Sequence, residues 1–512
     1  MNPSGWSRFS AGLALTALLA AAPAAAQSPE PGLGLVEAVR MMLGTDPNLS
    51  LEQARVRSAR GLLLSTRGEF DPVLATSVGE EEITNPISER SSEEQRILTN
   101  SLGVTKRFRT GLSVEPGLSL SRTEETDAVN VGTFSFTVRQ PLLRGRGRDV
   151  TMAPELSAER EVAASELDLR QTTAERMLAV VSQYWQTRAA ALNLEILQEN
   201  EDRSRELLET TRKLIEADVT PAAELVQVEA NLVAAEASRI GGERLLFEAQ
   251  RDLGREIGLD RASIAALRLP TDPFPTVPAA AVPAASNGER FVAAALDRRA
   301  DLRAARERRN AAEVLLRAAD DGLKPRLDLV WIPSYTGLVE GNDAGSFFSP
   351  LYRNVPGASS SFGLTLSWPT LNSQARGERI RIEAAREQSL LFEDLVARQI
   401  GADVPTALDA VQREAQRVER ATTAIRLYEQ TVINEEKKLR AGSSTLIDLI
   451  SQRDRLTAAR QSQVSANLAL ALALARLRFE TGTLPVEGEP GPNWFGELTS
   501  VPSPDAPREV AP

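Results

Sequence analysis

An internal duplication constrains this chain more than any other feature. Residues 441–484 repeat residues 217–258 without a gap at an offset of 224, which places Gly258 on Gly482. A repeat of this length takes precedence over any local pattern, because it fixes the number of structural units. The chain is therefore expected to contain two copies of one unit.

A second alignment shows that the two copies differ in length. Val39 falls on Val292 and Pro72 on Pro325 at an offset of 253. The difference between the offsets of 253 and 224 gives the first copy 29 more residues, all between Pro72 and Ala217. That excess is about the size of one β-hairpin.

The composition favours an elongated helical protein. Charged residues make up 25% and aromatic residues 4% of the 512 positions, with Ala, Leu, Glu, Gln and Arg in long unbroken runs. Such a profile is typical of long helices and coiled coils. The net charge of −11 argues against nucleic acid as a partner.

The absence of Cys and His from the sequence excludes most active-site chemistry. Thiolate nucleophiles, disulfides, imidazole bases and the usual zinc, copper and haem ligand sets all need one of these residues. The carboxylates Glu80, Glu81 and Glu82 are expected in a solvated loop. We therefore expect no enzyme, no metal site and no cofactor.

Residues 1–26 are expected to be a secretory signal peptide. Arg8 precedes an apolar run from Ala11 to Ala22, and the run is followed by the small residues Ala24–Ala26. A membrane anchor is the alternative, but the run is shorter than the ~20 residues of a spanning helix. The mature chain has no other apolar run of that length.

Both copies run in the same order: helix, extended region beginning at a proline, very long helix, turn and second long helix. The predicted parts are a first repeat at 27–269 (strands about 72–140, helices about 150–216 and 221–258), a Pro/Ala-rich linker at 270–289, a second repeat at 290–484 (strands about 325–368, helices about 373–440 and 445–481) and a flexible tail at 485–512. Pro405 predicts a kink or break in the second very long helix.

Four strands are expected in the first repeat and two in the second. Leu112, Val114, Leu118 and Leu120 alternate with polar or small residues, as do Phe362, Leu364, Leu366 and Trp368. A half-buried strand in a soluble sheet is the usual reading of alternation. Here the polar phase is Ser, Thr and Gly, and a length of about ten residues suits a tilted strand that spans a membrane.

The order of elements and several local motifs resemble the TolC-type outer membrane efflux proteins over about residues 34–484. The motifs are the opening LVEAVRMMLGTDPNLSLEQARVRSAR, the strand-to-helix transition Gln140-Pro141-Leu142-Leu143-Arg144-Gly145 with its counterpart Trp368-Pro369-Thr370-Leu371, and the repeat ends Gly258-Leu259 and Gly482-Thr483-Leu484.

This resemblance implies a mixed α and β fold in which long antiparallel coiled-coil helices form a periplasmic α-barrel joined to a shared transmembrane β-barrel. It implies a homotrimer in outer-membrane lipid, extending into the periplasm. The partners implied are a periplasmic adaptor (membrane fusion) protein and an inner-membrane transporter of RND, ABC or MFS type. Two strands per repeat would give a trimer twelve strands, whereas an extra hairpin would give eighteen.

The resemblance also places candidate functional residues at the helical tips. Asp448 falls where the family has an inward-facing Asp at the periplasmic aperture, and Glu224 is its counterpart in the first repeat. Three copies around an axis would attract cations and have coupled, partly raised pKa values. The alternative for Asp448 is a solvated carboxylate at a helix start, where the helix dipole favours it.

Two positions depart from the family pattern. Ser451 replaces a second Asp, and Ser444 replaces an Arg that locks the closed state, so neither a double acidic ring nor that ionic lock is expected. The turn residues Val219, Thr220, Gly442 and Ser443 are candidates for contact with the adaptor or for turn chemistry alone.

The leading hypothesis is a passive outer-membrane exit duct of a tripartite efflux or type I secretion system. The chain has no phosphate-binding G-x-x-x-x-G-K-[ST] loop, so a partner must supply the energy. The alternative is a soluble periplasmic coiled-coil adaptor or scaffold. Drug efflux, metal efflux and protein secretion all fit the sequence.

Overall fold

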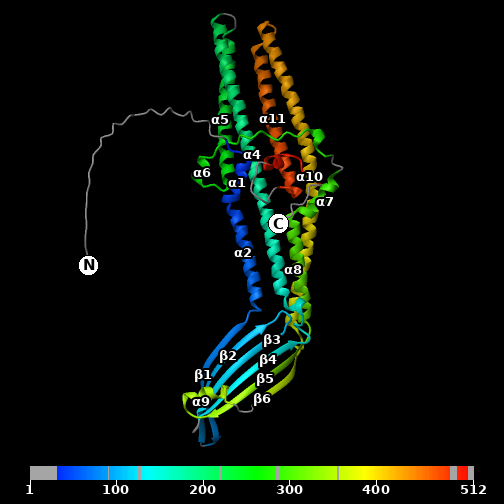
Figure 1. Ribbon diagram of the computed structural model, residues 1–512. Coiled ribbons are helices and arrows are strands. Elements are labelled where there is room, and N and C mark those ends of the chain that lie inside the picture. The colour runs from blue at the N-terminus through cyan, green and yellow to red at the C-terminus, as the bar shows by residue number, and fades with distance from the viewer. Residues whose placement is uncertain are drawn as a thin grey trace, which may run out of the picture.

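The protein is an elongated molecule with a single sheet at one end and two helical hairpins at the other (Figure 1). The computed structural model describes residues 32–89, 91–124, 128–217, 221–283, 287–353, 357–484 and 493–504. The predicted signal peptide, residues 1–26, lies outside the described residues, as do Val219 and Thr220.

The first repeat contains two helices, four strands and two long helices. These are α1 (Leu35–Thr45), α2 (Pro47–Gly68), β1 (Val73–Ser88), β2 (Ser91–Arg107), β3 (Ser113–Glu124), β4 (Val129–Pro141), the short α3 (Arg148–Thr151), α4 (Ala153–Glu216), α5 (Ala223–Ile257) and the short α6 (Arg261–Ala265). Asp46 separates α1 from α2 and caps α2 by accepting a 2.8 Å hydrogen bond from the Asn48 amide.

The second repeat follows the same order with only two strands. After the linker helix η1 (Ala279–Ala281) come α7 (Gly288–Arg298), α8 (Ala300–Gly322), β5 (Arg326–Glu340), α9 (Ala344–Phe348), η3 (Ser349–Leu351), β6 (Ala358–Ser367), α10 (Ser373–Arg440), α11 (Leu446–Glu480) and α12 (Asn493–Thr499). The excess of the first repeat is the predicted hairpin, because four strands there correspond to two here.

All six strands form one antiparallel sheet in the order β1-β2-β3-β4-β5-β6. The additional hairpin is a full part of this sheet: β2 pairs with β3 from Arg107↔Ser113 at the end next to the helices to Arg96↔Glu124 at the far end. Glu80, Glu81 and Glu82 lie within β1, so the prediction of a loop there is wrong.

The strand register gives the sheet two chemically different faces, because cross-strand partners point to the same side. One row across β1–β5 is entirely hydroxylated: Ser77, Ser101, Ser119, Thr133 and Thr336. The adjacent row on the opposite face is Thr76, Leu102, Leu118, Phe134, Tyr335 and Ala358. The polar phase of Ser, Thr and Gly expected from the sequence therefore lies on one face.

The very long helices α4 and α10 have 64 and 68 residues, equivalent to roughly 95–100 Å at ~1.5 Å per residue. α10 continues through Pro405, so the helix does not break there. Pro405 is exposed, so the Gly401 carbonyl that loses its helical partner lies on a solvent-accessible side of the helix.

Two hydrophobic cores hold the helices together where the short helices meet the long hairpins. The first surrounds Tyr184 and Trp185 of α4, and the second contains Phe291 of α7 and Leu408 of α10. Trp494 and Leu498 of α12 are buried in the first core. The flexible tail predicted for residues 485–512 is therefore wrong for this segment, whose apolar residues are anchored.

Among the described residues, no helix combines the length and the apolar character needed to cross a membrane.

Candidate functional site at the helical tips

The hairpins α4–α5 and α10–α11 end side by side at the pole remote from the sheet (Figure 1). In the second hairpin the turn begins at Gly442, which has φ +73, the left-handed conformation expected from the sequence. The Ser443 amide donates to the Lys438 carbonyl at 2.9 Å, and the Gly442 amide donates to the Leu439 carbonyl at 3.0 Å. These bonds close the end of α10 tightly.

Asp448 lies in the first turn of α11 and forms a capping box with Thr445. The Asp448 amide donates to Thr445 Oγ1 at 3.2 Å, while the Thr445 amide donates to Asp448 Oδ2 at 3.3 Å. The Thr445 hydroxyl lies 2.6 Å from the same oxygen. Hydrogen bonding from the Thr445 side chain, and then from its amide, lowers the pKa of the exposed Asp448 carboxyl.

This pKa direction within one chain is opposite to the partly raised values predicted for a ring of three copies. It agrees with the alternative in which the carboxylate stabilises a helix start. Asp448 therefore has a local capping role whether or not it also faces an axis.

Ser444 contacts Glu435, a buried carboxylate near the end of α10 that the sequence analysis did not single out. The Ser444 hydroxyl donates to Glu435 Oε1, and Lys438 Nζ donates to Glu435 Oε2 at 3.0 Å. These two hydrogen bonds, Ser444 first, lower the pKa of Glu435. Ser444 thus hydrogen-bonds the turn to α10. It occupies the position for which the sequence analysis expected no ionic lock by an Arg.

Glu224 and Ser451 lie near the starts of α5 and α11, the second helices of the two hairpins. Glu224 lies in the first turn of α5, where its amide donates to the Pro221 carbonyl at 3.1 Å. Ser451 is partly buried in α11, one turn beyond Asp448. The neighbouring Ile450 packs with Leu207 of α4, so the two hairpins meet through apolar contacts near their tips.

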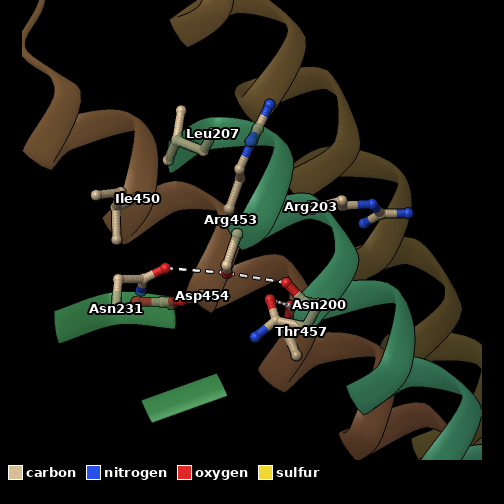
Figure 2. Close-up of a pocket in the computed structure, with 9 residues that line it drawn as sticks. Asn200, Arg203, Leu207, Asn231, Ile450, Arg453, Asp454 and Thr457 are labelled. Carbon is tan, nitrogen blue, oxygen red and sulfur yellow. Dashed lines mark hydrogen bonds between the residues drawn. The ribbon is translucent and has the colours of Figure 1, made fainter. Parts of the chain in front are cut away.

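Figure 2 shows a small groove between α4, α5 and α11 just behind these residues. It is lined by Asn200, Arg203, Ser204, Leu207, Asn231, Ile450, Arg453, Asp454 and Thr457. Ser204 Oγ donates to Asn231 Oδ1 at 3.0 Å, which joins α4 to α5. Thr457 Oγ1 donates to Asn200 Oδ1 at 3.1 Å and joins α11 to α4.

Asp454 has the one carboxylate among the residues that line the groove, and its side chain is exposed. Within the described part of the chain it makes no hydrogen bond or ion pair, although Arg453 precedes it and Arg203 lines the same groove. Arg453 pairs instead with Glu436 at 2.7 Å, and Arg203 with Glu199 at 2.9 Å. Desolvation by the surrounding helices raises the pKa of Asp454.

A second connection between the hairpins lies one turn further from the tip. Arg460 of α11 donates to Glu199 of α4 at 2.9 Å and to Glu429 of α10 at 3.2 Å. The sequence analysis did not single out Asp454 or Arg460, because α11 carries several charged residues of both signs and neither position stands out among them. At the repeat offset of 224, Arg460 aligns with Glu236, a residue of opposite charge, so the alignment of the two repeats does not mark this position either.

The comparison with protein families supports the second repeat directly. Residues 292–483 match the family model described as "Outer membrane efflux protein". No curated protein sequence is similar enough to the chain to give a match.

Solved structures of outer-membrane channels share the fold of almost the whole chain. The outer-membrane channel OprN superposes with a TM-score of 0.65 at 18% identity, over 88% of this chain and 90% of its own. The Campylobacter jejuni CmeC outer membrane channel gives 0.64 at 12% identity, over 91% and 90%. The outer membrane protein VceC of Vibrio cholerae gives 0.63 at 16% identity, over 88% and 96%.

Residues 292–483 thus match the outer membrane efflux protein family in sequence, and almost the whole chain shares the fold of outer-membrane channels of known structure.

Proposed function

We propose that the protein is a passive outer-membrane exit duct, with its sheet in the lipid and its helical hairpins in the periplasm. The observation that carries this proposal is the exposed apolar face of the sheet. Phe362, Leu364 and Leu366 of β6 are 72%, 66% and 64% exposed. A sheet face of this kind is stable in contact with lipid rather than water.

The opposite face fits a water-filled lumen. Its hydroxyl side chains bond to one another, as between Ser77 and Ser101, whose oxygens are 2.7 Å apart, and between Ser334 and Ser359, also at 2.7 Å. Apolar residues outside and polar residues inside are the arrangement of transmembrane β-barrels.

The edges of the sheet support a shared barrel built from three chains. β1 and β6 are the terminal strands of the described sheet, each bonded to one neighbour. Unpaired edges are not tolerated in lipid, and six strands are too few for the usual barrel of eight or more. Three copies joined β6 to β1 make a barrel of eighteen strands, wider than one of twelve because diameter grows with strand number.

The tips of the hairpins are the proposed docking and gating end. Gly442 and Ser443, together with Val219 and Thr220, would contact a periplasmic adaptor protein. Asp448 and Glu224 would line the aperture, with Ser451 and Ser444 in place of further charged groups. An inner-membrane transporter of RND, ABC or MFS type would supply energy to this non-enzymatic duct.

A soluble periplasmic scaffold would share the helical hairpins. That function leaves the exposed apolar side chains of β6 in water, at an unfavourable free energy of about 25 cal/mol for every Å² of apolar surface. The exit duct is therefore the better account of this sheet.

Single-channel conductance in a planar bilayer tests the proposal. The protein, extracted from membranes in detergent, is expected to insert and to give discrete conductance steps. Gel migration that changes on heating should accompany insertion, because closed barrels resist unfolding. A folded protein that remains in the soluble periplasmic fraction and gives no conductance steps would exclude the duct and favour the scaffold.

A further inference from the structure

The connection between β5 and β6 folds back over the sheet instead of projecting from it. Its two short helices, α9 and η3, contact the middle strands β3, β4 and β5 at the end of the sheet remote from the hairpins (Figure 1). We call residues 341–353 of this connection the rim segment.

Glycines in two strands seat the rim segment on the apolar face. Gly132 and Gly337 are cross-strand partners in the row of Leu120, on the same face as Leu118 and Phe134. A Cβ atom at Gly337 would lie 2.1 Å from the Pro350 carbonyl oxygen, and one at Gly132 would lie 2.9 Å from Pro350 Cβ. Only glycine allows this approach, so the segment is fixed outside the proposed lumen.

Ser346 and Ser349, the buried polar side chains of the rim segment, are hydrogen-bonded within it. Ser346 Oγ donates to the carbonyls of Gly341 and Asp343 at 2.7 Å, and Ser349 Oγ donates to the Gly345 carbonyl at 2.6 Å. Arg122 of β3 donates to the Asp343 carbonyl at 2.8 Å and lies over the Phe347 ring. Internal satisfaction of this kind is what a low-dielectric environment requires.

The outward surface of the rim segment is aromatic and aliphatic. Phe348 is 54%, Leu351 40% and Tyr352 72% exposed. These side chains continue the exposed apolar face of the sheet to its far end. The segment covers the middle strands, so the β1 and β6 edges lie to either side of it. A second copy joined at either edge would therefore leave the segment uncovered.

We propose that the rim segment is an interfacial anchor that binds the outer-leaflet boundary of the membrane. Phe348 and Leu351 insert at the level where acyl chains meet the headgroups, and the exposed Tyr352 ring lies at the same level, with its hydroxyl 3.2 Å from Ser349 Oγ. Aromatic side chains with a polar tip favour this depth. The inference rests on the proposed function, since it requires the apolar sheet face to lie in lipid.

Tryptophan quenching by brominated lipids tests the anchor. In the chain without the predicted signal peptide, which carries Trp6, the residues Trp331 and Trp368 are replaced by Phe, which leaves the buried Trp185 and Trp494 as an unreachable background. Single reporters are then introduced as Phe348→Trp, Tyr352→Trp, Phe362→Trp on the apolar face and Ser121→Trp on the hydroxyl face. Each variant is reconstituted in phosphatidylcholine vesicles brominated either near the headgroup or near the chain end.

The anchor predicts that Phe348→Trp and Tyr352→Trp lose most of their reporter emission to bromine near the headgroup and less to bromine near the chain end. Phe362→Trp should be quenched as well, and Ser121→Trp by neither lipid. If Phe362→Trp is quenched but neither rim reporter is, the duct stands and the anchor is wrong. If no reporter is quenched, the proposal that the sheet lies in the membrane is wrong, and the anchor proposal, which depends on it, is wrong as well.

Discussion

Asp448 and Asp454 lie six residues apart on α11 and have opposite electrostatic environments. Asp448 accepts hydrogen bonds from Thr445 and has a lowered pKa, whereas Asp454 is exposed but partly desolvated by the helices that line the groove, which raises its pKa. Ionisation is favoured by the fold at the first position and opposed at the second. The pair therefore allows two predictions of opposite sign from the same substitution.

Replacement of Asp448 by Asn is expected to destabilise the folded protein at neutral pH. A lowered folded pKa means that the charged carboxylate contributes stability above its unfolded value, 3.8, and that this contribution is lost as the pH falls through the folded pKa. Thermal unfolding should give a lower Tm for Asp448→Asn at pH 7 and a smaller difference in acid. An equal deficit at both pH values would contradict a charge-dependent cap.

Replacement of Asp454 by Asn is expected to stabilise the folded protein at neutral pH. Its raised folded pKa favours the protonated form, so the relative stabilisation is complete below about 3.8 and lost as the pH rises through the folded pKa. Asp454→Asn should therefore unfold at a higher temperature than the wild type at pH 7 and at the same temperature in strong acid. A lower Tm at pH 7 would mean that the carboxylate has a partner when the chains assemble.

The ring proposal predicts that Asp448 influences ion selectivity. Three carboxylates around a narrow aperture attract cations, so the wild-type pore should be cation-selective and Asp448→Asn less so. Reversal potentials in a salt gradient measure this change. Glu378→Gln, which removes a charge at the sheet end of α10, is the matched control. A pore whose selectivity is equal in wild type and Asp448→Asn would leave the duct intact and reduce Asp448 to a helix cap.

The duplication in the sequence predicts most of the fold because it records the elements that both repeats share. The long hairpins follow from local patterns that recur, whereas the six strands follow from local alternation and Gly442 stands where the first repeat has Asp218. The continuity of α10 at Pro405 does not, because it depends on which side of the helix meets solvent. The docking of Trp494 depends on a core made by distant helices, which no local pattern reveals.

The candidate site was predicted less completely than the fold. Asp448 was singled out through the family resemblance and Glu224 through the repeat, but the groove beside Asp454 is formed by three helices from both hairpins. The Asp454 carboxylate is unusual because it has no hydrogen-bond or ion-pair partner among the described residues. The absence of a partner cannot be recognised from the sequence. The sequence identifies Ser444 as the replacement of an Arg that would form an ionic lock, whereas its hydrogen bond to Glu435 depends on the geometry of the turn.

The glycines that end α5 and α11 are expected to be equally important in both repeats. Gly258 and Gly482 have φ +87 and +65, and in each case the next amide closes the helix end: Leu259 on the Gly254 carbonyl and Thr483 on the Arg478 carbonyl. Gly258→Ala and Gly482→Ala should each lower the free energy of unfolding by about 1–2 kcal/mol, the penalty for a left-handed residue with a Cβ atom.

Gly61→Ala in α2 is the control for this prediction, measured in the same denaturant titration. Gly61 lies inside a helix with nothing within 4 Å of an added Cβ atom, so alanine should stabilise it by roughly 0.5–1 kcal/mol. Equal effects at all three positions would argue that the left-handed conformation is not what the repeat ends require.

Arg460 is expected to restrain the tips, because it joins three of the four long helices. It pairs with Glu199 of α4 and Glu429 of α10 from its own position on α11, whereas Arg453 of α11 pairs with Glu436 of α10. Each exposed pair contributes only about 0–1 kcal/mol, so Arg460→Ala should fold normally. Its loss should nevertheless let the hairpins separate and raise single-channel conductance. Arg413→Ala, which breaks a pair with Asp409 inside α10 alone, should leave conductance unchanged. If both variants conduct like the wild type, the tips are held by apolar packing around Leu207 and Ile450 instead.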